Sequence, residues 1–363
     1  MGVSRVIGPG EREWFRRCRR AWDLGSPNRQ NWERRDERAP GLATAVRRAL
    51  AVWYFPGMWE WPRPIVLPRA LQAFDQAVVT TTGRLPDEGA IRSARRMLER
   101  YLAWAPTVDA FAPVRVEADF EANIPNPRTP GHDLVDDGGR AVRYQDRLHL
   151  LIVDKNDAYW VVEHRLTEDG WADRDELLLA ERPVAGAWGW EQFYCMVIAG
   201  TVHNELRLVA EREAGPTRGE LVESAVARRP RARDWARSRY AGARPREPDD
   251  IVVEEDGGWF RRTWIPRRRA EMDAVAHHLF GEAVDMLDPG GGLYPSPGPE
   301  HCSRCDYRMP CIAMNQGTDV DAVLAAAYRP REGHGLQEGR LGGGTWSMNR
   351  GAAPPPQWRS PPD

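Results

Sequence analysis

Residues 142–153 (VRYQDRLHLLIV) and 158–166 (AYWVVEHRL) are two apolar runs joined by a short polar segment. Runs of this length, rich in branched and aromatic side chains, are typical of buried β-strands. The joining residues, Asp154-Lys155-Asn156-Asp157, are of types that favour tight turns. The three segments together predict a β-hairpin.

The length of the turn decides which side chains of this hairpin share a face. With a two-residue turn at Lys155-Asn156, His149 would pair with Val162, and Glu163 would face away from it. A three-residue or bulged turn would instead pair His149 with Glu163. The turn contains no glycine, so the sequence leaves both arrangements open.

Further segments have the patterns of apolar residues that are typical of strands and of helices. Residues 113–123 alternate between apolar and charged side chains, which predicts a strand with Glu117 among its polar residues. Strands are also predicted at 203–210, 251–254 and 259–265, and helices at 11–23, 41–55, 87–104, 184–200 and 267–286. This order predicts an α/β or α+β fold, a mixed sheet covered by helices.

The composition limits the class of protein. The chain has 363 residues, of which 42% are hydrophobic and 29% charged, enough to bury a core. No apolar run approaches the roughly 18 residues of a membrane span, and the arginine-rich N-terminus is unlike a signal peptide. We therefore expect a cytoplasmic protein with no membrane partner. The 51 basic and 53 acidic residues argue against an overall basic surface, but a local basic groove remains compatible with them.

The cysteines are the most specific motif. Cys302, Cys305 and Cys311 form a C-x2-C-x5-C pattern, in which a tight turn can bring thiolates to one metal centre. Three thiolates leave such a centre one ligand short, and Cys18 can supply the fourth, which would join distant parts of the chain. The set favours an iron–sulfur cluster, with a zinc site completed by His301 as the alternative.

Glu163 and Arg165 are two residues apart on one predicted strand, so they share a face. A carboxylate beside a cation suits metal-assisted phosphoryl chemistry, in which the carboxylate binds magnesium or manganese and the cation steadies the phosphate charge. The simpler interpretation is an exposed ion pair between the two. By the same reasoning His149 would be a core histidine, and Glu117 a polar residue on the outer face of its strand.

At these motifs the sequence resembles the PD-(D/E)XK nuclease superfamily, from about Gly8 to Ala313. More narrowly, it is similar to the RecB-like branch with an iron–sulfur cluster, which includes CRISPR-associated and AddB-type nucleases. In that family a strand reading G-R-I-D precedes a strand reading V-D/E-x-K. Asp146–His149 and Val162–Arg165 occupy those places here.

Other family motifs have weaker counterparts. The family's upstream helical histidine corresponds to Arg47, within residues 41–50, and a glutamate of the preceding strand corresponds to Glu117. The family's glutamine and tyrosine on the helix after the hairpin match Gln192 and Tyr194.

The resemblance implies a restriction-endonuclease-like α/β fold and a metal-dependent DNA nuclease, exonuclease-like, that acts on single-stranded DNA or DNA ends. Glu163 would be the chief ligand of Mg²⁺ or Mn²⁺, assisted by His149 and Glu117, and Arg165 would contact phosphate. Cys18, Cys302, Cys305 and Cys311 would hold a structural 4Fe–4S cluster. A helicase or repair protein is the implied partner.

The sequence departs from the family at three of these places. His149 replaces the metal-binding aspartate, Arg165 the lysine, and Arg47 the helical histidine. Histidine brings no negative charge to Mg²⁺, and arginine does not act as a base. Two other hypotheses therefore stand: a catalytically inactive nucleic-acid-binding or adaptor protein that keeps fold and cluster, and a zinc-stapled protein of unrelated function.

We expect residues 1–315 to form the nuclease-like domain, with its terminal segments joined by the cluster, and 316–363 to form a short helix and a disordered tail. Residues 212–248 read as an insertion or weak helix. Within them, the arginines at 228–246 are interleaved with aromatic residues, which suits single-stranded nucleic acid. Cys195 lies in an apolar stretch and is predicted to be a core residue.

Overall fold

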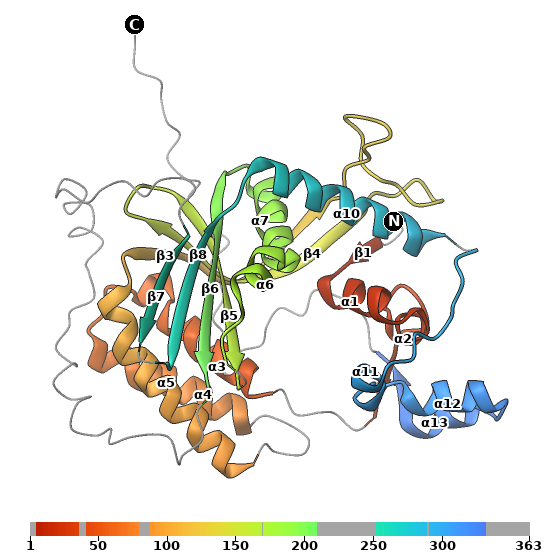
Figure 1. Cartoon of the computed structure of the whole chain (residues 1–363), viewed down its shortest axis with the longest axis horizontal. Coiled ribbons are helices and arrows are strands. Elements are labelled where there is room, and N and C mark those ends of the chain that lie inside the picture. Colours follow the sequence, from red (N-terminus) through yellow and green to blue (C-terminus); the bar gives the residue numbers. More distant parts are fainter. Residues whose placement is uncertain are drawn as a thin grey trace, which may run out of the picture.

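The structure, a computed structural model, describes residues 5–35, 41–79, 87–168, 170–208, 251–256, 258–288 and 290–331. Its centre is a mixed seven-stranded sheet with helices on both faces, so the predicted α/β class is confirmed (Figure 1). The strands are β1 (Arg5–Ile7), β3 (Phe111–Asn123), β4 (Val142–Asp154), β5 (Tyr159–Thr167), β6 (Ile198–Arg207), β7 (Val252–Asp256) and β8 (Phe260–Pro266). They are ordered β1-β4-β5-β6-β8-β7, and β3 also pairs with β4.

Strand β4 has two different edges. One edge pairs with β3 in antiparallel fashion along nearly its whole length. The other edge pairs with β1 at residues 142–144 and with β5 at residues 150–153. Residues 145–149 therefore lie between the two ladders on this edge. We call this stretch the β4 gap.

The β4–β5 hairpin has the odd-length turn. The ladder runs from Leu150 opposite Val162 to Val153 opposite Tyr159, and the Asp154 amide donates to the Ala158 carbonyl at 2.9 Å. Continued by one residue, this register sets His149 opposite Glu163.

The turn is closed by residues suited to it. The carboxylate of Asp154 accepts the amides of Asn156 and Ala158, and Asp157 adopts the left-handed conformation, with a φ of 63°. Aspartate tolerates this conformation better than most side chains, which explains a three-residue loop without glycine.

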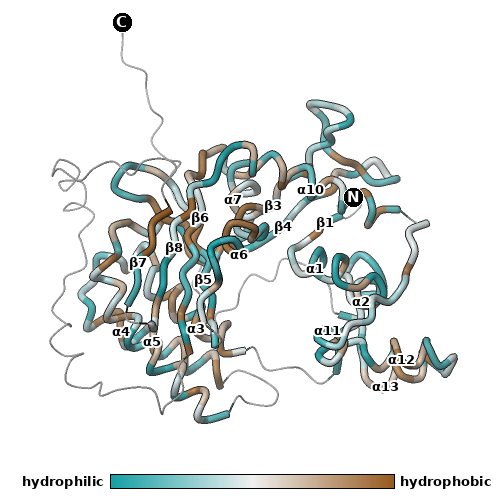
Figure 2. Tube along the Cα trace, in the orientation of Figure 1, coloured by the Kyte–Doolittle hydropathy of each residue, from teal (hydrophilic) through white to brown (hydrophobic). Residues whose placement is uncertain are grey.

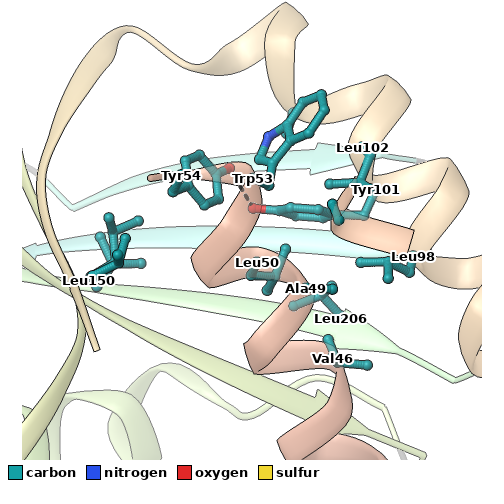
Figure 3. Close-up of a cluster of buried hydrophobic side chains, with 14 of the residues drawn as sticks. Val46, Ala49, Leu50, Trp53, Tyr54, Leu98, Tyr101, Leu102, Leu150 and Leu206 are labelled. Carbon is teal, nitrogen blue, oxygen red and sulfur yellow. Dashed lines mark hydrogen bonds between the residues drawn. The ribbon is translucent and has the colours of Figure 1, made fainter. Parts of the chain in front are cut away.

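Each face of the sheet buries its own core. Helices α3 (Leu42–Trp53), α4 (Arg63–Val79) and α5 (Glu88–Val108) cover one face and enclose the first core. Figure 3 shows the α3 side chains of this core packed against leucines of α5 and of the sheet. Helices α7 (Glu181–Tyr194) and α10 (Arg269–Leu287) cover the other face and enclose the second core. No helix of the described part is both long and apolar enough to cross a membrane.

Three predictions of local structure were wrong. The helix predicted at 11–23 is broken at Cys18, which is extended between α1 (Pro9–Arg17) and α2 (Arg19–Gly25). The helix predicted at 184–200 ends at Tyr194, and β6 begins at Ile198. Cys195 is exposed and therefore not a core residue. It has a left-handed backbone at the end of this helix, where the chain turns back towards the sheet.

The two ends of the described chain form a small unit beside the sheet (Figure 1). Strand β2 (Trp32–Arg34) pairs with β9 (Tyr328–Pro330), and helices α11 (Pro299–Ser303), α12 (Arg308–Gln316) and α13 (Val320–Ala327) lie next to α2. A separate core of Ala21, Leu24, Tyr307, Leu324 and Tyr328 holds the unit together. In Figure 2 helix α1, which precedes this unit in the chain, is mostly hydrophilic.

The chain beyond residue 315 thus contains the expected short helix, α13, and also a strand that belongs to this terminal unit. The tail predicted after it lies outside the described residues from 332 onward. The insertion predicted at 212–248, with its arginine run, also lies outside them.

Close packing of α7 on the sheet gives the first testable prediction. A Cβ atom on Gly189 would collide with the ring of Phe120 on β3. We expect Gly189→Ala to lower the free energy of unfolding by about 1–3 kcal/mol, measured by chemical denaturation. The control is Gly281→Ala in α10, where a Cβ would meet nothing within 4 Å. That change should raise stability by about 0.5–1 kcal/mol. Equal effects of the two substitutions would refute this packing.

Candidate functional site

The strand β3 changes face at Glu117. Val116 belongs to the first core, whereas Phe120 and Ala122 belong to the second, although residues an even number apart normally share a face. Glu117 has a φ of 44°, in the left-handed region that glutamate rarely adopts. The interpretation of Glu117 as a residue of a regular outer face is therefore corrected, since the alternation reverses at this residue.

The strand β4 changes face at the same level. Leu148 lies in the second core and Leu150 in the first, so the alternation reverses at His149. The pairs Ala118–Leu148 and Val116–Leu150 flank this level without a change of register. Both strands therefore kink at the one row that contains Glu117 and His149, at the end of the β4 gap.

His149 is buried and enclosed by hydrogen-bonding groups. Its Nε2 lies 2.7 Å from the guanidinium of Arg47, and its Nδ1 lies 3.1 Å from the amide of His164 and 3.4 Å from a carboxylate oxygen of Glu163. Burial, with His164 and the nearby arginines, lowers the pKa of His149 to about 2. A neutral imidazole has a single lone pair, and donors approach both nitrogens here. His149 therefore does not fit the predicted role of metal ligand.

Glu163 lies at the other side of the same row. Its carboxylate is 3.4 Å from the guanidinium of Arg182, at the start of α7, and burial raises its pKa to about 7 although Arg182 opposes the shift. Asp146, within the β4 gap, is 3.5 Å from the same guanidinium and accepts the hydroxyl of Tyr144 at 3.2 Å. The structure thus brings two carboxylates together around one arginine.

Glu117 adds a third carboxylate. Burial raises its pKa, against the attraction of Arg47 and Arg147. Glu117 and Asp146 both act on the pKa of Glu163, so the three acids share one electrostatic environment. Desolvation is the largest cause of both raised pKa values, so the nearby arginines do not fully offset the cost of burying Glu117 and Glu163 as charged groups. We call these three carboxylates with Arg47, His149 and Arg182 the β4-gap cluster.

Arg165 lies apart from this cluster. Its guanidinium is 2.6 Å from Glu176 of α6 (Arg174–Leu179), and both side chains are about half exposed, at 47% and 50%. The ion pair between Glu163 and Arg165 considered from the sequence is not the pairing found, because each has another partner. Gln192 and Tyr194 lie at the exposed end of α7, about three turns from Arg182.

Sequence reasoning missed Asp146 and Arg182 as site residues. Asp146 stood in the quoted motif at the family's glycine position, and an acid within an apolar strand was the available signal. Arg182 gave no local signal, because its partners are 19 and 36 residues away in the chain.

Stacked aromatic rings connect the β4-gap cluster to the first core. The rings of His149 and His164 are parallel within 7° at 6.0 Å, and that of His164 stacks on Tyr54 at 6.1 Å. The hydroxyl of Tyr54 lies 2.9 Å from that of Tyr101, which accepts from the buried Arg262 (Figure 3). A continuous row of buried polar rings therefore fixes the orientation of His149.

The structure places Cys18 near the C-terminal cysteines. Cys18 and Cys305 both pack against the core of the terminal unit, and Arg20 lies 3.4 Å from the sulfur of Cys311. Burial raises the pKa of the Cys305 thiol, and the adjacent Cys18 contributes to the rise. The sulfur of Cys302 accepts the amide of Gly298.

Cys18 and the three cysteines of the C-x2-C-x5-C motif are all half-buried thiols. Within the described residues, however, no three histidine, cysteine or acidic side chains are close enough together to hold a metal ion. His301 contacts the Ser296 carbonyl through Nε2, so only its Nδ1 could bind zinc. Four thiols are nevertheless a donor set that is chemically suited to an iron–sulfur cluster.

No family model matches the chain, and no curated protein sequence matches it. Among solved structures the chain is similar to one described as "Crystal structure of SSO0001". The two share 10% identity over 74% of this chain and 82% of that chain, with a TM-score of 0.27. A likeness at this level carries no argument about fold or function.

His203 gives a pH-dependent prediction for the neighbouring strand. It pairs with Glu163 across β5 and β6, and burial together with Arg267 lowers its pKa from 6.5 to about 4. The unfolded chain therefore binds a proton below pH 6.5 that the folded chain excludes, and stability falls as the pH drops from 6.5 to 4. We expect His203→Gln to remove on the order of 3 kcal/mol of this loss, measured as the difference in unfolding free energy between the two pH values. An unchanged pH dependence would contradict the assignment.

Proposed function

We propose that the protein is a metal-dependent phosphodiesterase that acts on DNA, as its resemblance to the RecB-like nucleases implies. The observation that carries the proposal is the pair of carboxylates, Asp146 and Glu163, at one arginine in the β4 gap, where an odd-length turn aligns the hairpin and Glu117 acts on the pKa of Glu163. Within the described residues no neighbouring strand pairs with this edge of β4 at residues 145–149, and the side chain of Glu163 beside it is 23% exposed.

The carboxylates fit a hard divalent ion better than His149 does. Mg²⁺ and Mn²⁺ prefer oxygen ligands, and one or two carboxylates completed by water are a common arrangement. Glu163 and Asp146 would hold the ion, with Glu117 beside them, and a bound cation would oppose the desolvation that raises the pKa values of Glu163 and Glu117. When bound, the ion would activate water and neutralise charge on a phosphate.

The remaining side chains have positioning roles in this proposal. Arg47 and the His164 amide approach the two ring nitrogens of His149 and hold the ring beside the carboxylate of Glu163. This contact would orient the carboxylate without supplying a metal bond. Single-stranded DNA or DNA ends as substrate, and a helicase or repair protein as partner, rest on the family resemblance alone.

We further propose that Cys18, Cys302, Cys305 and Cys311 hold a 4Fe–4S cluster, with zinc as the alternative. Support comes from the terminal unit, in which the broken helix at Cys18 lies beside α11 and α12. All-thiolate ligation suits iron–sulfur clusters. The cluster would be structural and would tie the two ends of the described chain together.

A second function is favoured by specific contacts: nucleic-acid binding without cleavage. The lone pair of His149 is engaged by neighbouring donors, and Arg165 is bound to Glu176. Of the three family positions that differ in sequence, His149 and Arg165 are thus engaged by other groups, and Arg47 contacts His149 itself. A protein of this kind would keep the arginines of the β4 gap for phosphate contacts.

Cleavage of single-stranded DNA in Mn²⁺ tests the first function. We expect Glu163→Gln to lower the cleavage rate at least about 100-fold, because the amide keeps the shape but removes the charge that binds the ion. The matched control, Glu176→Gln, alters an exposed acid of the Arg165 pair and should keep the rate within about twofold. Wild-type protein that binds DNA in a salt-dependent manner but does not cleave it would establish the second function instead.

Metal analysis tests the proposed iron–sulfur cluster. Protein purified without oxygen should be brown and contain iron and sulfide, and Cys305→Ser should lose most of both, since a serine is a poor ligand for the cluster. Cys195→Ser is the control, because Cys195 is exposed at the end of α7 and outside the motif. Colourless protein with stoichiometric zinc would replace the cluster by the zinc alternative.

A further inference from the structure

We propose that Arg182, and not Arg165, supplies the cation that contacts a phosphate of the bound nucleic acid. The inference rests on the proposed function and refines its site. It reassigns the role that the family resemblance gives to Arg165 to a side chain from a different element, helix α7.

The first argument is position. The guanidinium of Arg182 lies 3.4 Å from Glu163 and 3.5 Å from Asp146, so it is in contact with two of the three acids of the β4-gap cluster. Arg165, on the strand of Glu163 itself, instead directs its guanidinium to Glu176 on α6.

The second argument is the kind of contact that each arginine makes. Arg147 binds Asp119 through two nitrogens at 2.6 and 2.8 Å, and Arg165 binds Glu176 at 2.6 Å. These distances are those of strong charge-assisted hydrogen bonds. The contacts of Arg182 are longer and divided between two acids, so its donors are not committed to one carboxylate. Its side chain is 45% exposed, which lets the guanidinium meet a ligand from solvent.

The third argument is that α7 holds Arg182 in place. Gly186, one turn further along, lies so close to β4 that a Cβ there would be 3.1 Å from Leu148. Residues four apart share a helix face, so Arg182 is directed to the same strand as Gly186. The helix thus sets the guanidinium over the β4 gap, and its N-terminal position adds a favourable field for a phosphate.

The fourth argument excludes the nearby charges as substitutes. Glu181, the neighbour of Arg182, is bound by Arg12 and Arg16 and so does not neutralise it. Arg47, the other arginine of the β4-gap cluster, contacts the ring of His149 at 2.7 Å. Arg182 is therefore the arginine of the cluster best placed to take an anion.

The test compares Arg182→Gln with Arg165→Gln, two identical changes of half-exposed arginines. Binding of a fluorescent single-stranded oligonucleotide would be measured from low to physiological salt, beside thermal unfolding of each variant. For Arg182→Gln we expect binding about 5- to 10-fold weaker and a salt dependence smaller by about one phosphate contact. Arg165→Gln should change both by less than twofold. Arg182→Lys should recover the salt dependence, because it restores the charge.

Each outcome decides the inference. A loss confined to Arg165→Gln, or no loss in either variant, would overturn it. Cleavage that needs Glu163 but is unaffected by Arg182→Gln would overturn it while leaving the proposed nuclease intact. Binding that depends on Arg182 in a protein that does not cleave would support it and reject the nuclease. Wild-type protein that binds no DNA would overturn both.

Discussion

The central physical constraint of this structure lies at residues 145–149 of β4, where the described part of the chain places no strand on one edge and backbone and charge still have to be satisfied. Unpaired backbone groups in such a place are costly. Side chains supply partners on both strands of the hairpin: Nδ1 of His149 accepts the amide of His164 on β5, and Asp146 accepts the amide of Arg147 on β4 at 2.7 Å. The polar side chains of the β4 gap are therefore required by the sheet itself, whatever ligand they bind.

The reversal of faces at Glu117 and His149 follows from this constraint. Because both strands turn over at one level, the side chains of that row can leave the two apolar cores and gather between them. A left-handed glutamate costs on the order of 1 kcal/mol or more. Such strain persists only where surrounding structure fixes it, and here α3 supplies Arg47 from one face while α7 supplies Arg182 from the other.

The hairpin and the order of helices and strands could be predicted from the sequence because they depend on local periodicity. The register of His149 and Glu163 could be reduced to two alternatives, which the conformation of Asp157 then decides. The face reversal could not be foreseen from the sequence. Apolar and charged residues alternate regularly over residues 113–123, and nothing in that pattern indicates the left-handed backbone at Glu117. Arg182 was missed because its role depends on how α7 packs against the sheet through Gly186 and Gly189. The break at Cys18 was missed because a regular apolar stripe continues through it.

The charge balance of the β4-gap cluster connects the two candidate functions. The family resemblance places a carboxylate at position 149, and the neutral histidine there removes one negative charge from the position nearest Glu163. Two arginines contact the cluster from opposite faces. The loss of one carboxylate would weaken the binding of a divalent ion, and the loss of that negative charge would leave Arg182 freer to attract a phosphate. In the proposed function, a histidine at the position where the family resemblance implies an aspartate would favour holding the nucleic-acid backbone over holding metal, and the carboxylates of Glu117 and Asp146 would limit that effect.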